Sequence, residues 1–400
     1  HRIRQRYNCD RLLRQAKQLT KQKVSVTDVS RLSSKQVLIV GWYGTETAGD
    51  KAILWTIIQR LRSRADSPER IYLASLYPFI SQWTVKEMEL GNISVIETYS
   101  PRFEQVCRVV NEVVVGGGPL MDIEALNHIL YAAIQAAKIN AIVRVEGCGI
   151  GPLATPVYTK VVTETLKLAD HITLRDSNST QRCIQDFAVT SVETVADPAT
   201  DYVEFVKAKS AILTNTTPPL GHARNIACFL REWGQDYAGK LSKAEYSGMK
   251  HQFETQLVEF IIELARANNA DIHLLPMHTF QIGGDDRVFN RQLAKKITSS
   301  NIPQPLGKLV NYARAPVSPL EILQSMHHAE FNLCMRFHSV LFAETLGVPY
   351  LAIDYTNGGK IKAFLEAKNK LNRLISLQEI ATGAWKTQFQ ALVEISSYSS

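Results

Sequence analysis

Short hydrophobic runs and longer amphipathic segments alternate along most of the chain. The hydrophobic runs lie at residues 36–40, 70–76, 93–97, 112–115, 141–145 and 171–174. Each run has the length of a buried strand, and the segments between the runs carry apolar residues at helical spacing. This alternation is typical of βα repeats that build a parallel sheet.

A second series of the same kind follows a stretch in which the pattern weakens. Periodicity fades over residues 201–220, where Thr216-Thr217-Pro218-Pro219 is a candidate hinge. Further strands are predicted at residues 225–230, 271–275, 331–335 and 350–353, with a long helix face over 253–264. We therefore expect an α/β fold with two Rossmann-like domains facing across a cleft, the architecture called GT-B.

Length and cysteine usage agree with this picture. The chain has 400 residues, more than one typical core supports, so we expect an extension (1–34), an N-terminal domain (35–210) and a C-terminal domain (211–400). The last helices are candidates to pack back on the first domain. Six scattered cysteines form no CxxC pair, which favours reduced thiols, a cytoplasmic protein and no zinc site.

Positive charge is concentrated at the start of the chain. The net charge is +7, and residues 1–23 are rich in Arg and Lys but contain a single acid, Asp10. We interpret this segment as a peripheral helix or linker without an apolar face, and residues 1–30 as a candidate for peripheral membrane contact. A solvated extension is the simpler alternative, and we expect no nucleic-acid partner.

Glycine-rich loops follow three of the predicted strands. The loop residues expected near a ligand are Gly44, Gly49 and Asp50 in the first, Gly116, Gly117 and Gly118 in the second, and Gly149 in the third. None of the loops matches GxGxxG or a P-loop. Because the carboxyl ends of parallel strands meet at one edge of the sheet, the loops predict a ligand site there. Tight turns and close helix–sheet packing are the alternatives.

Charged residues follow the strands predicted in the second half. Arg231 lies at one strand end, and Arg336 and His338 lie at another, directly before a predicted helix. If the strand persists to His338, period-two spacing places these two on one side of the chain, as a candidate acid–base and anion site. A surface salt bridge is the alternative. The spacing of His278, Asp285, Asp286, His327 and His328 matches no metal site, so we expect no metal.

These segments occur in an order that resembles the polysaccharide pyruvyl transferase family. The motifs are GWYGTETAGDKAIL (41–54), VVGGGPLMD (114–122), GCGIGPL (147–153), ITLRDSNS (172–179), ADPA (196–199), FLREW (229–233) and MRFHSVLFAETLGVP (335–349). The resemblance covers about residues 36–365, and the last motif is the most specific. It implies an acceptor site on the N-terminal domain and a donor site on the C-terminal domain.

The resemblance also implies a reaction and residue roles. The chain would form a pyruvate ketal on a sugar of a glycan or lipid-linked intermediate, with phosphoenolpyruvate as co-substrate and no other cofactor. Arg231 and Arg336 would bind the donor, and His338 would act with Arg336 in catalysis. Tyr355 and Lys360 would complete the donor site, although residues 356–359 replace the family's Asp-Pro turn.

Two other functions stay open on the sequence. A glycosyltransferase that uses a nucleotide sugar is one, since the GT-B fold hosts many such enzymes. A non-catalytic homologue that acts as a binding module is the other, and the altered turn and the basic extension favour it. The intact pair of Arg336 and His338 favours an enzyme instead.

Overall fold

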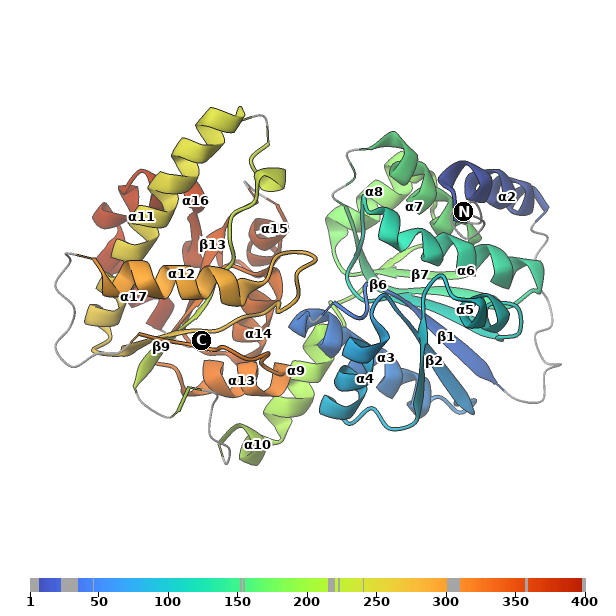
Figure 1. The fold of residues 1–400 in the computed structure, drawn as a ribbon, viewed down its shortest axis with the longest axis horizontal. Helices are drawn as coiled ribbons and strands as arrows, with labels where there is room; N and C mark the ends of the chain where they lie inside the picture. Colours follow the sequence, from blue (N-terminus) through green and yellow to red (C-terminus); the bar gives the residue numbers. More distant parts are fainter. Residues whose placement is uncertain are drawn as a thin grey trace. The chain divides into compact units, whose positions relative to one another are not determined.

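The computed structural model describes residues 7–22, 35–45, 47–151, 153, 155–214, 220–221, 224–239, 241–300, 310–356 and 359–397. The chain forms two compact units, His1–Tyr202 and Val203–Ser400 (Figure 1). The sequence placed this division after residue 210. The hinge predicted at residues 216–219 lies outside the described residues.

The first unit is built on a parallel sheet in the order β3-β2-β1-β4-β6-β7-β8, with β5 paired to β6. Its strands are β1 (Gln36–Gly41), β2 (Arg70–Ser75), β3 (Ile93–Glu97), β4 (Glu112–Gly116), β5 (Pro119–Leu120), β6 (Ile142–Ile150), β7 (His171–Leu174) and β8 (Glu193–Thr194). Its helices are α2 (Cys9–Gln22), α3 (Ala48–Ser63), α4 (Pro78–Glu87), α5 (Pro101–Val106), η1 (Glu124–Leu126), α6 (Asn127–Lys138), α7 (Pro156–Leu168), α8 (Ser177–Phe187) and the start of α9 (Ala199–Ala208). All six strands predicted for this half are confirmed.

The second unit repeats this plan with the order β11-β10-β9-β12-β13-β14, again parallel. Its strands are β9 (Asn225–Phe229), β10 (Asp271–Leu274), β11 (Val310–Tyr312), β12 (Phe331–Cys334), β13 (Tyr350–Asp354) and β14 (Leu374–Ser376). Its helices are α10 (Ser210–Thr214), η2 (Gln235–Tyr237), α11 (Lys243–Ala267), α12 (Asp286–Thr298), α13 (Pro319–His328), α14 (Phe337–Leu346), α15 (Lys360–Ala367), η3 (Leu371–Arg373), α16 (Leu377–Ala381), η4 (Ala384–Thr387) and α17 (Phe389–Ser397). The edge strands β11 and β14 were not predicted, because three residues carry too little pattern.

Each sheet reverses its strand order at one place. In the first unit the reversal lies between β1 and β4, and in the second between β9 and β12. Helices cover both faces of each sheet (Figure 1). Open α/β sheets bind ligands beyond the carboxyl ends of the two strands at such a reversal. The loops after β1, β4, β9 and β12 are therefore the first places to look for a site.

The basic start of the chain is part of the first core. Leu12, Leu13 and Ala16 of α2 are buried and belong to the hydrophobic core of this unit. The ring centre of Tyr7 lies 4.5 Å from that of Tyr99 in an edge-to-face contact. The expectation that this segment lacks an apolar face is wrong for residues 7–22, because the basic residues hide a short apolar stripe at helical spacing.

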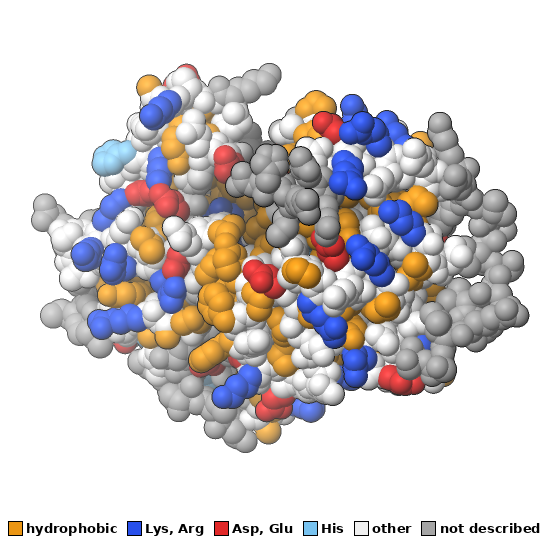
Figure 2. All heavy atoms as spheres, turned by 45° about the vertical axis from the view of Figure 1, so that its right-hand side comes forward, with side chains coloured by type: hydrophobic (Ala, Val, Ile, Leu, Met, Phe, Trp, Pro, Cys, Tyr) orange, Lys and Arg blue, Asp and Glu red, His pale blue; other side chains and the backbone are white. Residues whose placement is uncertain are grey.

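Both signs of charge occur on the face drawn in Figure 2, where Lys and Arg side chains outnumber Asp and Glu side chains on the right of the view. Within the described ranges, none of the helices combines the length and apolar character that crossing a bilayer requires.

Leu12→Ala is expected to lower the free energy of unfolding by about 2–5 kcal/mol, because Leu12 is 1% exposed and the cavity would stay unfilled. Gln18→Ala, on the exposed face of the same helix, is the matched control and should change stability by less than about 0.5 kcal/mol. Urea denaturation followed by circular dichroism measures both. Equal effects of the two substitutions would show that α2 does not dock on this core.

Candidate active site

Arg231 lies just beyond β9, between two tyrosine rings. Its guanidinium carbon is 4.7 Å from the ring centre of Tyr237 and 4.8 Å from that of Tyr355. Its Nη1 donates to the two phenol oxygens at 3.4 and 3.3 Å. The two rings meet edge to face at 4.9 Å. These contacts hold a planar cation in one orientation.

The surroundings of Arg231 keep it charged. Burial opposes the charge, but the phenol groups of Tyr355 and Tyr237 and the carboxylate of Asp286 outweigh burial and raise the pKa of Arg231. A permanently charged, oriented guanidinium suits a carboxylate or phosphate, which it binds through paired N–H donors.

Arg336 follows β12 and caps the start of α14. Its Nε donates to Asp286 Oδ2 at 3.2 Å, and its Nη2 donates to Asp286 Oδ1 and, at 3.2 Å, to the carbonyl of Gly284. Asp286 is 1% exposed, and its Oδ2 also accepts from the backbone N–H groups of Met277 and His278 at 3.1 and 3.0 Å. Within the described part of the chain, nothing accepts a hydrogen bond from Nη1 of Arg336. This nitrogen is therefore placed to bind a ligand.

His278 shares Asp286 with Arg336, because the backbone N–H of His278 and the guanidinium of Arg336 both donate to that carboxylate. Its ring is buried, and its Nε2 lies 2.6 Å from the carbonyl oxygen of Ile282. Burial, followed by the charge of Arg336 and more weakly that of Arg231, lowers the pKa of His278 to about 4, against the opposing effect of Asp286. The imidazole is thus neutral near pH 7, and the cations of the site remain those of the arginines.

His338 lies in the first turn of α14, with a buried Nε2. The period-two spacing of Arg336 and His338 depended on a strand that persists to His338, and this condition is not met, because β12 ends at Cys334 and α14 begins at Phe337. The Phe337 ring centre lies 5.3 Å from that of His338 and 5.3 Å from Nζ of Lys360. The start of α14 therefore carries Arg336 and His338, and Phe337 contacts Lys360.

The altered turn after β13 is closed by its own hydrogen bonds. Asp354 accepts from the backbone N–H and the hydroxyl of Thr356 at 2.9 and 2.7 Å, and Gly359 donates its N–H to Thr356 Oγ1 at 3.1 Å. Residues 357 and 358 lie outside the described residues. Tyr355 is buried and contacts Arg231. The turn thus keeps Tyr355 at the site without the family's Asp-Pro pair.

The glycines after β4 pack tightly against protein side chains. A Cβ on Gly116 would lie 2.3 Å from Ile57 Cδ1, and one on Gly117 would lie 2.6 Å from the ring of Tyr43. The backbone of Gly117 has φ +73°, which side chains other than glycine rarely allow. Backbone conformation and close packing therefore favour glycine at Gly117, and at Gly116 a side chain would displace the end of Ile57.

The remaining loop glycines differ in which polar side chain lies closest to them. A Cβ on Gly44 would lie 2.4 Å from a serine hydroxyl, and one on Gly149 would lie 2.9 Å from an arginine nitrogen. At Gly118 a Cβ would instead lie 3.0 Å from Oδ1 of Asp50. Gly49 and Asp50 are buried in the first turn of α3. The triple-glycine loop and the first loop thus meet at Asp50.

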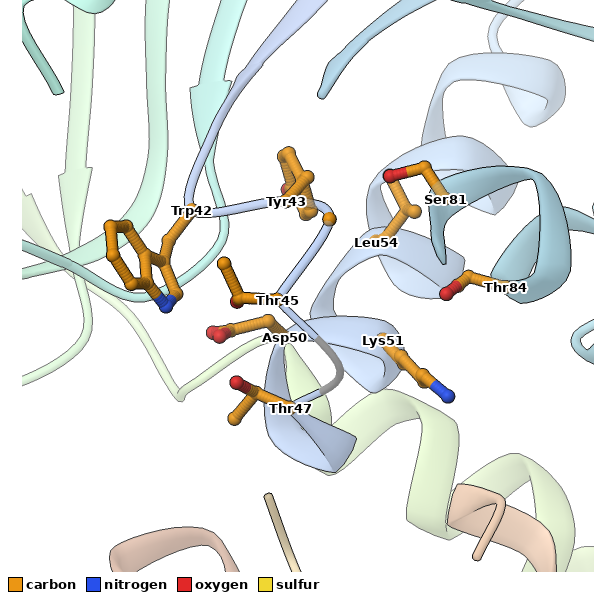
Figure 3. A pocket seen from close by; sticks show the side chains of 10 residues that line it. Trp42, Tyr43, Thr45, Thr47, Asp50, Lys51, Leu54, Ser81 and Thr84 are labelled. Carbon is orange, nitrogen blue, oxygen red and sulfur yellow. The ribbon is translucent and has the colours of Figure 1, made fainter. Parts of the chain in front are cut away.

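A pocket opens at this place (Figure 3). The residues that line it are Trp42, Tyr43, Gly44, Thr45, Thr47, Asp50, Lys51, Leu54, Ser81 and Thr84. The Lys51 ammonium pairs with Glu87 at 2.8 Å, and both side chains are largely buried. The positive charge of Lys51 is therefore compensated within the protein.

Two residues of the arginine site were not predicted to belong to it. Tyr237 lies in a polar stretch without periodicity, and for Asp286 the sequence favoured an ordinary surface or supporting role over metal binding. Asp286 could have been predicted near the site from its place after a buried strand and at the start of a helix. Its pairing with Arg336 could not have been predicted, because Arg336 is fifty positions away in the sequence. Over the described ranges, no three His, Cys, Asp or Glu side chains are grouped so that they could hold a metal ion.

Solved structures share this fold at low sequence identity. The UDP-GlcNAc 2-epimerase of Methanocaldococcus jannaschii is similar over 88% of this chain and 92% of its own, with a TM-score of 0.56 and 15% identity. The Neisseria meningitidis UDP-GlcNAc 2-epimerase bound to UDP-GlcNAc is similar over 90% of this chain and 93% of its own, with a TM-score of 0.57 and 11% identity. Anabaena HepE in complex with UDP-glucose is similar over 90% of this chain and 92% of its own, with a TM-score of 0.52 and 10% identity. These similarities show the fold alone, which is the GT-B fold.

The sequence itself points to one family. No curated protein matches it significantly. The pattern of the family described as polysaccharide pyruvyl transferase matches residues 17–357, a range that contains the glycine loops and Arg231, Arg336 and His338. The match extends over most of both units. The chain therefore belongs to the polysaccharide pyruvyl transferase family.

Proposed function

We propose that this chain transfers the pyruvyl group of phosphoenolpyruvate onto two hydroxyls of a sugar in a glycan or glycolipid intermediate. The observation that carries the proposal is that Arg231 and Arg336 each follow one of two strand ends, Phe229 of β9 and Cys334 of β12, that pair in register, in a member of this family. His338 lies two residues after Arg336, in the first turn of α14. Phosphoenolpyruvate bears a carboxylate and a phosphate. Two oriented guanidinium groups match two anionic groups that share one small molecule.

The reaction requires two proton movements. One acceptor oxygen bonds to the central carbon of phosphoenolpyruvate, and the methylene carbon takes up a proton and becomes a methyl group. The bond to the phosphate oxygen then breaks, and a second acceptor oxygen bonds to the same carbon. The two acceptor hydroxyls lose two protons. One proton is accounted for by the new methyl group, and the other leaves on hydrogen phosphate. We assign these transfers to His338, since an imidazole accepts a proton at a ring nitrogen and can donate it again.

The charges of the site agree with this assignment. Arg231 and Arg336 supply two positive charges, and Asp286 balances one of them. Lys360, whose Nζ lies 5.3 Å from the ring centre of Phe337, adds another cation. Negative charge grows on the phosphate oxygens as the carbon–oxygen bond breaks, and fixed cations stabilise that charge more than the ground state. Asp286 has the separate role of orienting Arg336.

His338→Ala is expected to lower turnover by about 100- to 10,000-fold, the usual contribution of a general acid–base residue, while donor affinity stays unchanged. Phosphate release from phosphoenolpyruvate, measured with a panel of sugar acceptors, gives the turnover. His327→Ala, which removes an exposed imidazole from α13, is the matched control. Wild-type turnover in a folded His338→Ala protein would remove His338 from the mechanism.

Arg231→Lys and Arg336→Lys are each expected to weaken phosphoenolpyruvate binding by about 10- to 100-fold, because lysine keeps the charge but loses the paired donors. The double variant should lose less than the sum of the two, since neighbours that share a ligand are not additive. Arg266→Lys, whose guanidinium pairs with Glu263 in α11, controls for the chemistry of the substitution. Calorimetric affinities equal to wild type in both single variants would place the donor elsewhere.

A further inference from the structure

A cluster of basic side chains lies on the first unit, where α2 packs against α6. Its members come from α2, from the end of α6 and from the turn after α5, and all are exposed: Arg11, Arg14, Lys17, Arg108 and Lys138. The helix α6 contains no acidic residue, and Asp10 is the one acidic residue of α2. Three segments that are far apart in the sequence therefore place positive charge on one surface.

The cations of this cluster act on one another. The Nζ of Lys138 donates to Oε1 of Gln15 at 3.4 Å, which is an uncharged partner. Burial, and then the charges of Arg11 and Arg108, lower the pKa of Lys138. Arg108 lies 3.6 Å from the carboxylate of Glu104, and within the described ranges none of the other four cations forms an ion pair. Like charges that are held together without compensation favour an anionic partner.

Two aliphatic side chains are exposed directly beside these cations. Val109, which follows Arg108, is 57% exposed, and Ile139, which follows Lys138, is 40% exposed. The two turns are neighbours, because the N–H of Ile142 donates to the carbonyl of Asn111 at 2.9 Å where β6 starts to pair with β4. Exposed aliphatic groups gain nothing from a partner that is only ionic, but they gain free energy when they enter the apolar boundary of a bilayer.

This surface lies away from the ligand edge of the sheet. The turns after α5 and α6 lead into the amino ends of β4 and β6, whereas the loops expected to bind ligands follow the carboxyl ends of the strands. A partner on this surface would therefore leave the loops after β1 and β4 uncovered.

We propose that this basic and apolar surface docks the first unit on an anionic lipid bilayer. The five cations attract the lipid headgroups, and Val109 and Ile139 enter the interface. The sequence gave membrane contact to residues 1–30 alone, whereas the surface proposed here joins α2 to two distant turns. The inference goes beyond the proposed function, since it involves neither the donor nor the acceptor.

Vesicle sedimentation of the full chain tests this surface. The probes are vesicles of phosphatidylcholine alone and of phosphatidylcholine mixed with phosphatidylglycerol. We expect the wild type to bind the mixed vesicles only, and added salt to release it, because salt screens the attraction. The triple variant Arg11→Gln, Arg14→Gln, Lys138→Gln should bind the mixed vesicles about 100-fold more weakly, because each basic residue at an acidic bilayer contributes about fivefold.

A second triple variant controls for net charge. Lys243, Arg291 and Lys295 are exposed cations of α11 and α12 in the second unit. Their replacement by Gln removes the same charge from the chain but leaves the proposed surface intact. This variant should bind the mixed vesicles nearly as the wild type does.

Val109→Ser and Ile139→Ser distinguish a bilayer from a polyanion. Each should weaken binding to the mixed vesicles by about threefold or more, because an aliphatic side chain no longer enters the interface. Neither should change binding to inorganic polyphosphate, which has no apolar part. Ile184→Ser is the matched control, since Ile184 is 42% exposed on α8 of the same unit.

Three results would overturn the inference: the wild type does not bind the mixed vesicles, the two triple variants lose affinity equally, or Val109→Ser and Ile139→Ser bind these vesicles as the wild type does. The third result would assign the surface to a polyanion. None of these measurements uses phosphoenolpyruvate or a sugar, so their outcome is separate from that of the proposed function. A chain that consumes phosphoenolpyruvate without docking has the activity and lacks this surface.

Discussion

The candidate site depends on one buried carboxylate. Asp286 accepts hydrogen bonds from the backbone after β10 and from the guanidinium of Arg336 after β12, and it begins α12. Asp286 is 1% exposed, and a buried carboxylate needs a partner of opposite charge. Separating Asp286 from Arg336 would be costly, because it would leave a buried charge without its partner. The pair therefore fixes the distance between two loops. The negative charge of Asp286 also acts to raise the pKa of Arg231 and that of His278.

The two units use the same position for different chemistry. In both, the loops beyond the two strands at the sheet reversal approach each other, as open α/β sheets require. In the first unit those loops are glycine-rich and meet at Asp50. In the second they carry Arg231, Arg336 and His338.

The strands could be predicted from the sequence, and several partnerships could not. Hydrophobic runs predicted β1, β4, β9 and β12 because a buried parallel strand is apolar on both faces. Arg231 and Tyr355 were both predicted at the donor site, and the structure brings them into contact. The stacking of Tyr237 on Arg231 and the pairing of Asp286 with Arg336 depend on tertiary folding. The apolar stripe of α2 was missed because charged residues surround it.

The identity of the donor decides between two functions. A nucleotide-sugar donor is the direct rival of phosphoenolpyruvate, because the GT-B fold hosts many enzymes that use nucleotide sugars. Calorimetric titration of the wild-type chain with phosphoenolpyruvate, and separately with UDP-GlcNAc and UDP-glucose, distinguishes the two. We expect saturable binding of phosphoenolpyruvate and no binding of either UDP-sugar. Saturable binding of a UDP-sugar, with no heat from phosphoenolpyruvate, would contradict it.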